Sequence, residues 1–192
     1  MPRDYEFRPD PVGTGNFEKL LLSQRQRHGL LRWTLFGLLC VLALLVQDTM
    51  VCRISIFGAG TDLVPCVILM ITCLQGAEQG CIFALVSSVL YFFSGSAPGP
   101  YVVPLITVFA VLAVIFRQAC LRQGFFSILI STGLGLVCYE MGLFGIGLFL
   151  KHTLTQWAGV MFLTALLSLL AVPVAYPIAR AISKIGGETW KE

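Results

Sequence analysis

Charge is what this chain has least of: Asp, Glu, Lys and Arg together make up 12% of its 192 residues, against 57% for apolar residues. A soluble domain carries about twice that share of charge. The shortage excludes a large soluble catalytic domain, and the sequence has no basic patch of the kind that binds nucleic acid. The composition predicts a single membrane domain of several helices that takes up nearly the whole length.

Motifs for metals and cofactors are also missing. The only histidines are His28 and His152, none of the seven cysteines forms a C-x-x-C pair, and no glycine-rich phosphate loop occurs. Metal sites need clustered Cys and His, so we expect neither a metal nor a cofactor. Most of the cysteines fall in apolar runs, where a buried Cys behaves as a small apolar residue.

A catalytic arrangement is equally hard to assemble from these residues. Ser94 or Ser96 would need a neighbouring base to act as a nucleophile, and His152 is the only histidine predicted on that side of the membrane. Asp48 and Asp62 would be the pair for an aspartyl mechanism, but both lie at the ends of apolar runs. We therefore expect a protein that is not an enzyme and has no catalytic residues.

Six apolar runs can cross a bilayer, which takes about 20 residues per helix and fewer inside a bundle. A polar tail, residues 1–29, precedes them and is either disordered or carries a short surface helix. A second polar tail, residues 181–192, follows them. The sequence thus predicts an all-α, polytopic membrane helix bundle over residues 30–180. The six expected spans are Leu30–Val46, Ile56–Leu74, Ala77–Phe93, Tyr101–Phe116, Phe125–Leu150 and Leu154–Ala179.

The distribution of basic residues orients the six spans. With the amino terminus in the cytoplasm, eleven Lys and Arg residues fall on the inner side and two, Arg53 and Lys151, on the outer side. Short inner loops carry an excess of positive charge, so we expect both termini to be cytoplasmic. A five-span arrangement would place the basic C-terminal tail outside.

Small residues recur at every fourth position of the third run and form a ridge along one side of the predicted helix. Helices in lipid associate by close packing, so such a ridge marks a helix contact. The ridge either packs within this chain or docks the membrane helix of a partner, and the sequence does not separate the two. Its members are Gly76, Gly80, Ala84 and Ser88.

A single acid, Glu140, interrupts the fifth run, which otherwise carries no charge. A bare carboxylate at the bilayer centre costs about 3 kcal/mol on insertion scales. Glu140 must therefore be protonated, paired or turned toward a protein or water interior. Together with Tyr139 it is a candidate contact for a partner or ligand. The alternative is a neutral hydrogen-bonding group inside the bundle, for which Gln156 is a possible donor.

From Gly60 to about Leu150 the chain resembles the MreD family of bacterial rod-shape proteins. The shared features are an Asp-Leu entry to the second run, a tight turn into the third, a Ser-Gly and Pro-Gly turn after it, and a Tyr-Glu pair in the fifth. In this sequence they are Gly60–Leu63, Gln75–Gly80, Ser94–Tyr101 and Tyr139–Glu140. Two positions depart from the pattern: Thr61 stands where Pro is usual, and Tyr91 where an acid is often found.

The resemblance implies a non-enzymatic scaffold of the elongasome, in the bacterial inner membrane. Such proteins sit with the bitopic protein MreC, a RodA-like glycosyltransferase and a class B penicillin-binding protein, and they help to direct peptidoglycan synthesis and rod cell shape. The resemblance also implies a fold similar to that of the substrate-binding S subunits of energy-coupling-factor transporters. On this hypothesis the third-run ridge and the Glu140 region would contact the MreC-like partner.

A vitamin-binding S subunit is the alternative function. It would have a similar length, six spans and cytoplasmic termini. Such subunits typically carry an Ala-x-x-x-Ala motif in the first span, whereas the run from Leu35 to Val46 holds only Ala43. The scaffold is therefore the function that the sequence favours.

Overall fold

The computed structural model describes residues 24–49, 60–121, 124–150 and 157–185, and every regular element in these ranges is an α-helix. Short links reverse the chain between α2 and α3 and between α3 and α4, while α7 continues the direction of α6. Arg53, Lys151, His152 and Gln156, on which parts of the sequence analysis rest, lie outside the described residues. The helices are α1 (Gln24–Thr49), α2 (Leu63–Gln75), α3 (Ala77–Phe93), α4 (Val102–Cys120), α5 (Phe125–Phe149), α6 (Ala158–Leu169) and α7 (Ala171–Ser183).

Four helical stretches in the described part of the chain are long and apolar enough to cross a membrane. They are Gly29–Thr49 within α1, α4, α5, and the continuous stretch Ala158–Ser183 formed by α6 and α7. Helices α2 and α3 are shorter, at 13 and 17 residues. At 1.5 Å per residue, α2 is about 20 Å long, less than the hydrocarbon thickness of about 30 Å. The prediction of six spans is therefore confirmed for four stretches, while the second and third runs form short apolar helices.

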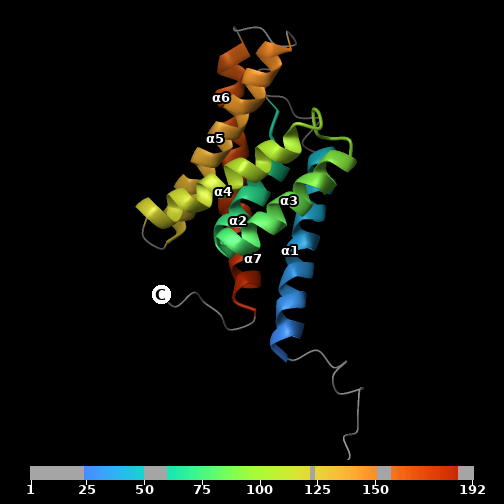
Figure 1. Ribbon diagram of the computed structural model, residues 1–192, viewed down its shortest axis with the longest axis vertical. Helices are drawn as coiled ribbons and strands as arrows, with labels where there is room; N and C mark the ends of the chain where they lie inside the picture. The colour runs from blue at the N-terminus through green and yellow to red at the C-terminus, as the bar shows by residue number, and fades with distance from the viewer. Residues whose placement is uncertain (1–23, 50–59, 122–123, 151–156, 186–192) are drawn as a thin grey trace, which may run out of the picture.

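Helix α2 is the centre of the bundle (Figure 1), and it contacts each of the other six helices. Of its thirteen residues, only Leu63 and Leu74 are not buried. This follows from its sequence, because its uninterrupted apolar residues leave no polar face to turn outward.

A glycine makes the tight turn from α2 into α3 that the sequence predicted. Gly76 has φ of 89°, which favours glycine because a Cβ would be strained there. Its backbone N–H donates to the carbonyl of Thr72, 3.1 Å away, and so closes the last turn of α2. The two helices therefore lie against each other as an antiparallel pair.

The last spanning stretch is interrupted at Leu170, where α6 ends and α7 begins. Pro173 lies in the first turn of α7 and has no backbone N–H to donate to the carbonyl four residues earlier. The break therefore falls one turn before Pro173, while Pro177 is accommodated inside α7.

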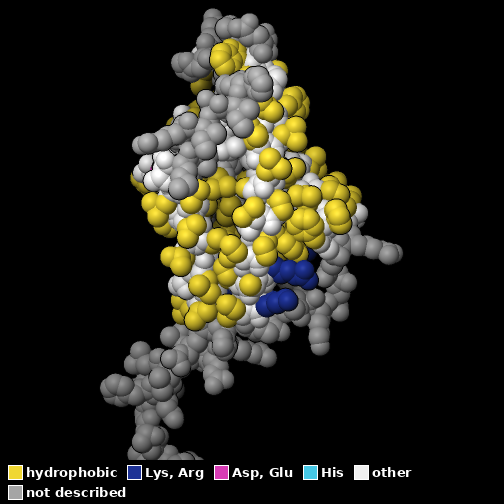
Figure 2. Space-filling model, turned by 180° about the vertical axis from the view of Figure 1, so that it is seen from behind, with side chains coloured by type: hydrophobic (Ala, Val, Ile, Leu, Met, Phe, Trp, Pro, Cys, Tyr) yellow, Lys and Arg dark blue, Asp and Glu magenta, His cyan; other side chains and the backbone are white. Residues whose placement is uncertain are grey.

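Apolar side chains cover the outside of the bundle (Figure 2). Every helix except α2 carries large hydrophobic residues that are more than a third exposed, for example Leu38, Leu85, Leu112 and Leu166. Such continuous apolar cover is rare on a soluble monomer and suits contact with lipid. The structure is therefore that of a membrane helix bundle with a packed interior.

The start of α1 and the end of α7 lie at the same end of the bundle (Figure 1). Two further basic residues lie at this end, where α2 ends and α3 starts. Arg32 donates to Gln79 at the start of α3, and Arg117 donates to the carbonyl of Cys73 near the end of α2. We call it the basic end. The opposite end, where α1 finishes and α2 starts, carries Asp48 and Asp62.

Candidate polar site at the start of the central helix

The ridge of small residues on α3 lies inside the bundle, against α2. Gly76, Gly80, Ala84 and Ser88 are all buried. A Cβ added to Gly80 would lie 2.7 Å from both the Cγ2 and the carbonyl oxygen of Thr72, so only glycine permits this close approach. At Gly80 the ridge therefore packs against α2, which is the internal packing that the sequence left open beside partner docking.

The Tyr-Glu pair of α5 is also buried: Tyr139 is 0% exposed and Glu140 is 6% exposed. The Glu140 carboxyl group lies beside the carboxyl group of Asp62, the residue that precedes α2. The structure thus joins two acids that are far apart in the sequence. The structure turns Glu140 toward the protein interior, which is one of the alternatives that the sequence left open for it.

Side chains from α1 and α6 hold the start of α2 in place. The Gln47 side-chain oxygen accepts the backbone N–H of Val64 at 2.9 Å, and its amide nitrogen lies 3.4 Å from the Tyr91 hydroxyl oxygen. The Ser168 hydroxyl oxygen accepts the backbone N–H of Asp62 at 2.7 Å. The first N–H groups of a helix have no partner within it, so Gln47 and Ser168 satisfy groups that would otherwise be buried unpaired.

Two buried oxygens at this site have no hydrogen-bond partner among the described residues. They are the Tyr139 hydroxyl oxygen and Oε1 of Glu140. The Tyr139 and Tyr91 hydroxyls both lie near the carboxyl groups of Asp62 and Glu140. The start of α2 is thus surrounded by two acids, two phenols and a glutamine, which we call the acidic cluster: Gln47, Asp62, Tyr91, Tyr139 and Glu140.

The other end of α2 has a different composition. Arg117 of α4 donates to the carbonyl oxygen of Cys73. The Cys73 sulfur lies 3.4 Å from the Ser131 hydroxyl oxygen, and Ser131 donates to the carbonyl of Ala113 at 2.5 Å. This end is therefore closed by a cation and neutral hydroxyls rather than by acids.

The serines considered for a hydrolase lie in the turn after α3, while His152, the base considered with them, lies outside the described residues. The Ser96 hydroxyl donates to the Asp48 carboxylate at 2.5 Å, and the Ser94 hydroxyl donates to the carbonyl of Tyr91 at 2.7 Å. These bonds tie the turn after α3 to the end of α1. Asp48 is exposed and is not a member of the acidic cluster, so the two acids considered for an aspartyl pair do not form one with each other. Among the described residues, no three His, Cys, Asp or Glu side chains gather as metal ligands.

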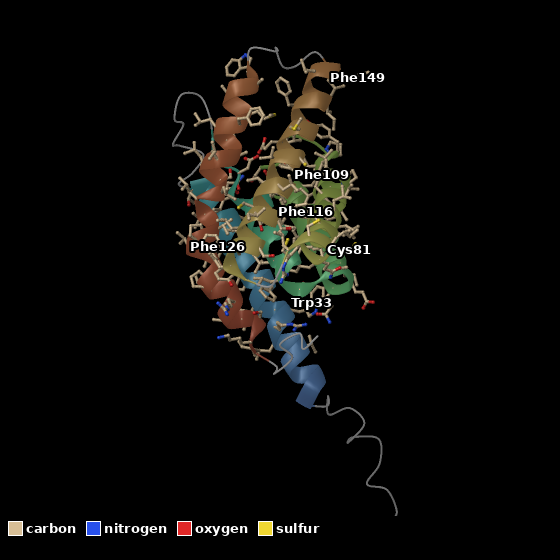
Figure 3. The ribbon with its side chains drawn as sticks, turned by 90° about the vertical axis from the view of Figure 1, so that its left-hand side faces the viewer. Trp33, Cys81, Phe109, Phe116, Phe126 and Phe149 are labelled. Carbon is tan, nitrogen blue, oxygen red and sulfur yellow. The ribbon has the colours of Figure 1, made fainter. Side chains whose placement is uncertain are left out.

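An apolar groove of about 220 Å³ lies between α4 and α5. Figure 3 shows two of its side chains, Phe109 and Phe116, beside α5. Its small members, Ala113 and Gly135, sit where the two helices approach closely, because a Cβ on Gly135 would lie 3.1 Å from the Ala113 Cβ. The other lining residues are Leu112, Leu134 and Cys138.

Sequence reasoning named Glu140 and Tyr139 but missed Gln47 and Ser168. The signal for Gln47 was present, since it is a polar residue in the last turns of a long apolar helix and directly precedes Asp48. Tyr91 was noted only as a departure from a family pattern. Its hydroxyl reaches the acidic cluster, at the position where the pattern often has an acid.

No protein-family model, curated protein or solved structure matches this chain.

Proposed function

We propose that this protein is a non-enzymatic membrane scaffold that binds the membrane helix of an MreC-like bitopic partner in the bacterial inner membrane. The proposal follows the resemblance of Gly60 to Leu150 to the MreD family. In that setting, a RodA-like glycosyltransferase and a class B penicillin-binding protein would be further partners. The basic end of the bundle would face the cytoplasm, because basic residues are retained on that side.

The packing of α2 is the observation that carries the proposal. A carrier needs a path or a ligand cavity through the middle of its bundle, whereas here the middle is a helix that contacts all six others. Fully buried apolar side chains such as Ile68, Met70 and Ile71 fill the space around it. A solid centre of this kind supports a protein that acts through its outer, lipid-facing surface.

The partner contact would then lie on the outside of the bundle, since the α3 ridge is occupied by α2. Interfaces between membrane helices are formed by close packing of small residues, and they do not need polar groups. We therefore expect the partner helix to contact exposed apolar faces, such as that of α3 formed by Ile82, Leu85 and Val86.

Co-expression with an MreC-like protein tests the proposal. We expect a stable complex after purification in mild detergent, and we expect Leu85→Trp and Val86→Trp to weaken it while the bundle stays folded. The matched control is Leu166→Trp, a comparably exposed apolar residue on α6. Folded chain that never co-purifies with the partner would contradict the scaffold function.

The S subunit of a vitamin transporter is the second candidate, and the unpartnered oxygens of Tyr139 and Glu140 favour it. Buried polar atoms without partners are unusual in a packed interior and are common where a ligand completes the site. Vitamin retained through purification would support this function. A higher thermal unfolding temperature after vitamin is added back to a chain stripped of it would support it as well. If thiamine, biotin and riboflavin leave the thermal unfolding temperature of the purified protein unchanged, the S-subunit function loses its support.

A further inference from the structure

Helices α4 and α5 pack against each other, and α4 ends on the side of the bundle where α5 begins (Figure 1). The Ser131 hydroxyl of α5 donates to the carbonyl of Ala113 in α4 at 2.5 Å. Residues four apart lie on the same face of a helix, so Arg117 and Ser127 stand one turn further along this contact, toward the end of α4 and the start of α5. Cys73 of α2 agrees with this placement, because its carbonyl accepts from Arg117 and its sulfur lies 3.4 Å from the Ser131 hydroxyl oxygen.

The start of α5 has backbone donors that the helix itself does not use. The residue before it is Gly124, and no side chain caps the helix there. The Ile128 N–H donates to the Gly124 carbonyl at 3.3 Å, and the N–H groups before it, those of Phe125, Phe126 and Ser127, have no partner within the helix. Together with the dipole of a 25-residue helix, these groups make the start of α5 favourable for an anion.

Ser127, in this first turn, independently points to a ligand. Its side chain is 5% exposed, and its hydroxyl oxygen has no hydrogen-bond partner among the described residues. Buried polar atoms in native proteins are almost always paired, so an unpaired hydroxyl calls for an explanation. A hydroxyl beside free backbone N–H groups can donate to an anion held at the start of its own helix.

Arg117 adds a full positive charge at this place. It is half-buried, and its hydrogen-bond partner among the described residues is the neutral carbonyl of Cys73 rather than a carboxylate. Arginine has further N–H donors in a planar fork that fits phosphate. The described acid at this end of the bundle, Glu78, is exposed in the first turn of α3, and the described hydrogen bonds of Arg117 do not include it.

The apolar groove between α4 and α5 begins beside this positive place. Its lining residue Phe116 directly precedes Arg117, and its small residue Ala113 is the one whose carbonyl accepts from Ser131. Leu112 and Leu134 line it as well and are 52% and 43% exposed, so the groove opens onto the lipid-facing surface. An apolar groove that leads to an arginine and a free helix start matches the shape and polarity of a phospholipid.

We propose that the surface between α4 and α5 is a binding site for one anionic phospholipid. One of its acyl chains lies in the groove, and its phosphate accepts hydrogen bonds from Arg117 and from the N–H groups at the start of α5, with the Ser127 hydroxyl as a further donor. Charge complementarity selects an anionic headgroup, because the described groups here are donors and a cation, with no acid to bind a choline or ethanolamine. The site lies away from the α3 face proposed for the partner helix, so it does not depend on the scaffold function.

Binding of radiolabelled phosphatidylglycerol to the purified, full-length protein in detergent tests the site. We expect saturable binding of a single lipid per chain, with phosphatidylcholine of the same acyl chains binding at least about tenfold more weakly. Arg117→Gln should weaken phosphatidylglycerol binding by about tenfold, because it removes the charged donor. Arg180→Gln is the matched control: Arg180 is an exposed arginine at the same end, on α7, and its loss should change the affinity by less than about twofold.

Leu134→Trp tests the groove separately from the charge. The larger side chain would occupy the space of the acyl chain, and we expect phosphatidylglycerol to bind at least about fivefold more weakly. Leu166→Trp on α6, an exposed apolar residue outside the groove, should leave the affinity unchanged.

Three results would overturn the lipid site. One is equal affinity of the wild type for phosphatidylglycerol and phosphatidylcholine, and this comparison holds even if the variants do not fold. Another is an equal loss of binding in Arg117→Gln and Arg180→Gln, which would show only general attraction to basic residues. The last is binding of glycerol phosphate, which has no acyl chains, as tightly as the lipid, since the groove would then contribute nothing.

Discussion

The two ends of the central helix α2 are closed by opposite charges. Its start faces the carboxyl groups of Asp62 and Glu140, and at its end the Cys73 carbonyl accepts a hydrogen bond from Arg117. The helix dipole favours acids at the start of a helix and cations at the end, so both arrangements stabilise α2. The difference is that Arg117 completes its end with a charge-assisted bond, whereas the acids leave oxygens without described partners. For α2 itself, one end is therefore structural, and the other is a candidate site.

The largest expected effect comes from separating α2 and α3 near the Arg117 end. Gly80→Leu would force side-chain atoms into the space of the Thr72 backbone, at a cost of about 4 kcal/mol or more. We expect loss of folded protein, measured by size-exclusion chromatography in detergent. Gly37→Leu on α1 is the control, because nothing lies within 4 Å of an added Cβ there. Equal yields of both variants would contradict the packing of α3 on α2.

Removing one acid from the start of α2 comes next. Glu140→Ala should destabilise the bundle by about 3 kcal/mol, since it leaves the partner carboxyl buried alone. Glu140→Gln should cost about 1 kcal/mol, because it keeps a neutral hydrogen-bonding group. Thermal unfolding of the two variants in one detergent measures the difference. Equal losses would show instead that the negative charge of Glu140 is what the fold requires.

Removing the cation from the end of α2 should cost less than Glu140→Ala. Arg117→Ala removes the donor to the Cys73 carbonyl, and we expect a loss of about 2 kcal/mol. Arg117→Lys should recover part of it, because Lys keeps one charged donor. If Arg117→Ala proves as costly as Glu140→Ala, the two ends of α2 are equally structural and the contrast between them fails.

Gln47→Ala tests the smaller contribution of α1 to the acidic cluster. It removes the acceptor for the Val64 N–H and the partner of Tyr91, and it should lower stability by about 1 kcal/mol. Gln79→Ala is the matched control: Gln79 is exposed at the basic end and its loss should be within about 0.5 kcal/mol of the wild type. Indistinguishable unfolding temperatures for the two variants would show that Gln47 does not hold the start of α2.

Much of the fold was predictable because it depends on local pattern. The bounds of α3, the start of α5 and the turn at Gly76 follow from apolar run length and from glycine at a positive φ. The interruption at Leu170 was less predictable, because prolines at 173 and 177 allow a break at more than one turn and packing decides which turn is broken. The ridge on α3 was identified as a contact, and its partner turned out to be α2.

The site was predictable only in part. Glu140 and Tyr139 stand out in an apolar run, whereas Asp62 looked like a residue at the end of a span, and nothing in the sequence pairs it with Glu140. Gln47 and Ser168 act on backbone groups of a distant segment, and such bonds leave no periodic pattern in the chain.

The amino-acid sequence by itself determined that this protein is a helix bundle for lipid, because long apolar runs with little charge are stable in a bilayer and not in water. It also determined that Glu140 needs a partner, since a lone carboxylate is costly in that medium. Only the tertiary structure decided which partner it has and which helix lies in the middle. Those outcomes depend on how side chains from distant segments fill the same space, and pairing across a bundle is set by packing rather than by spacing along the chain.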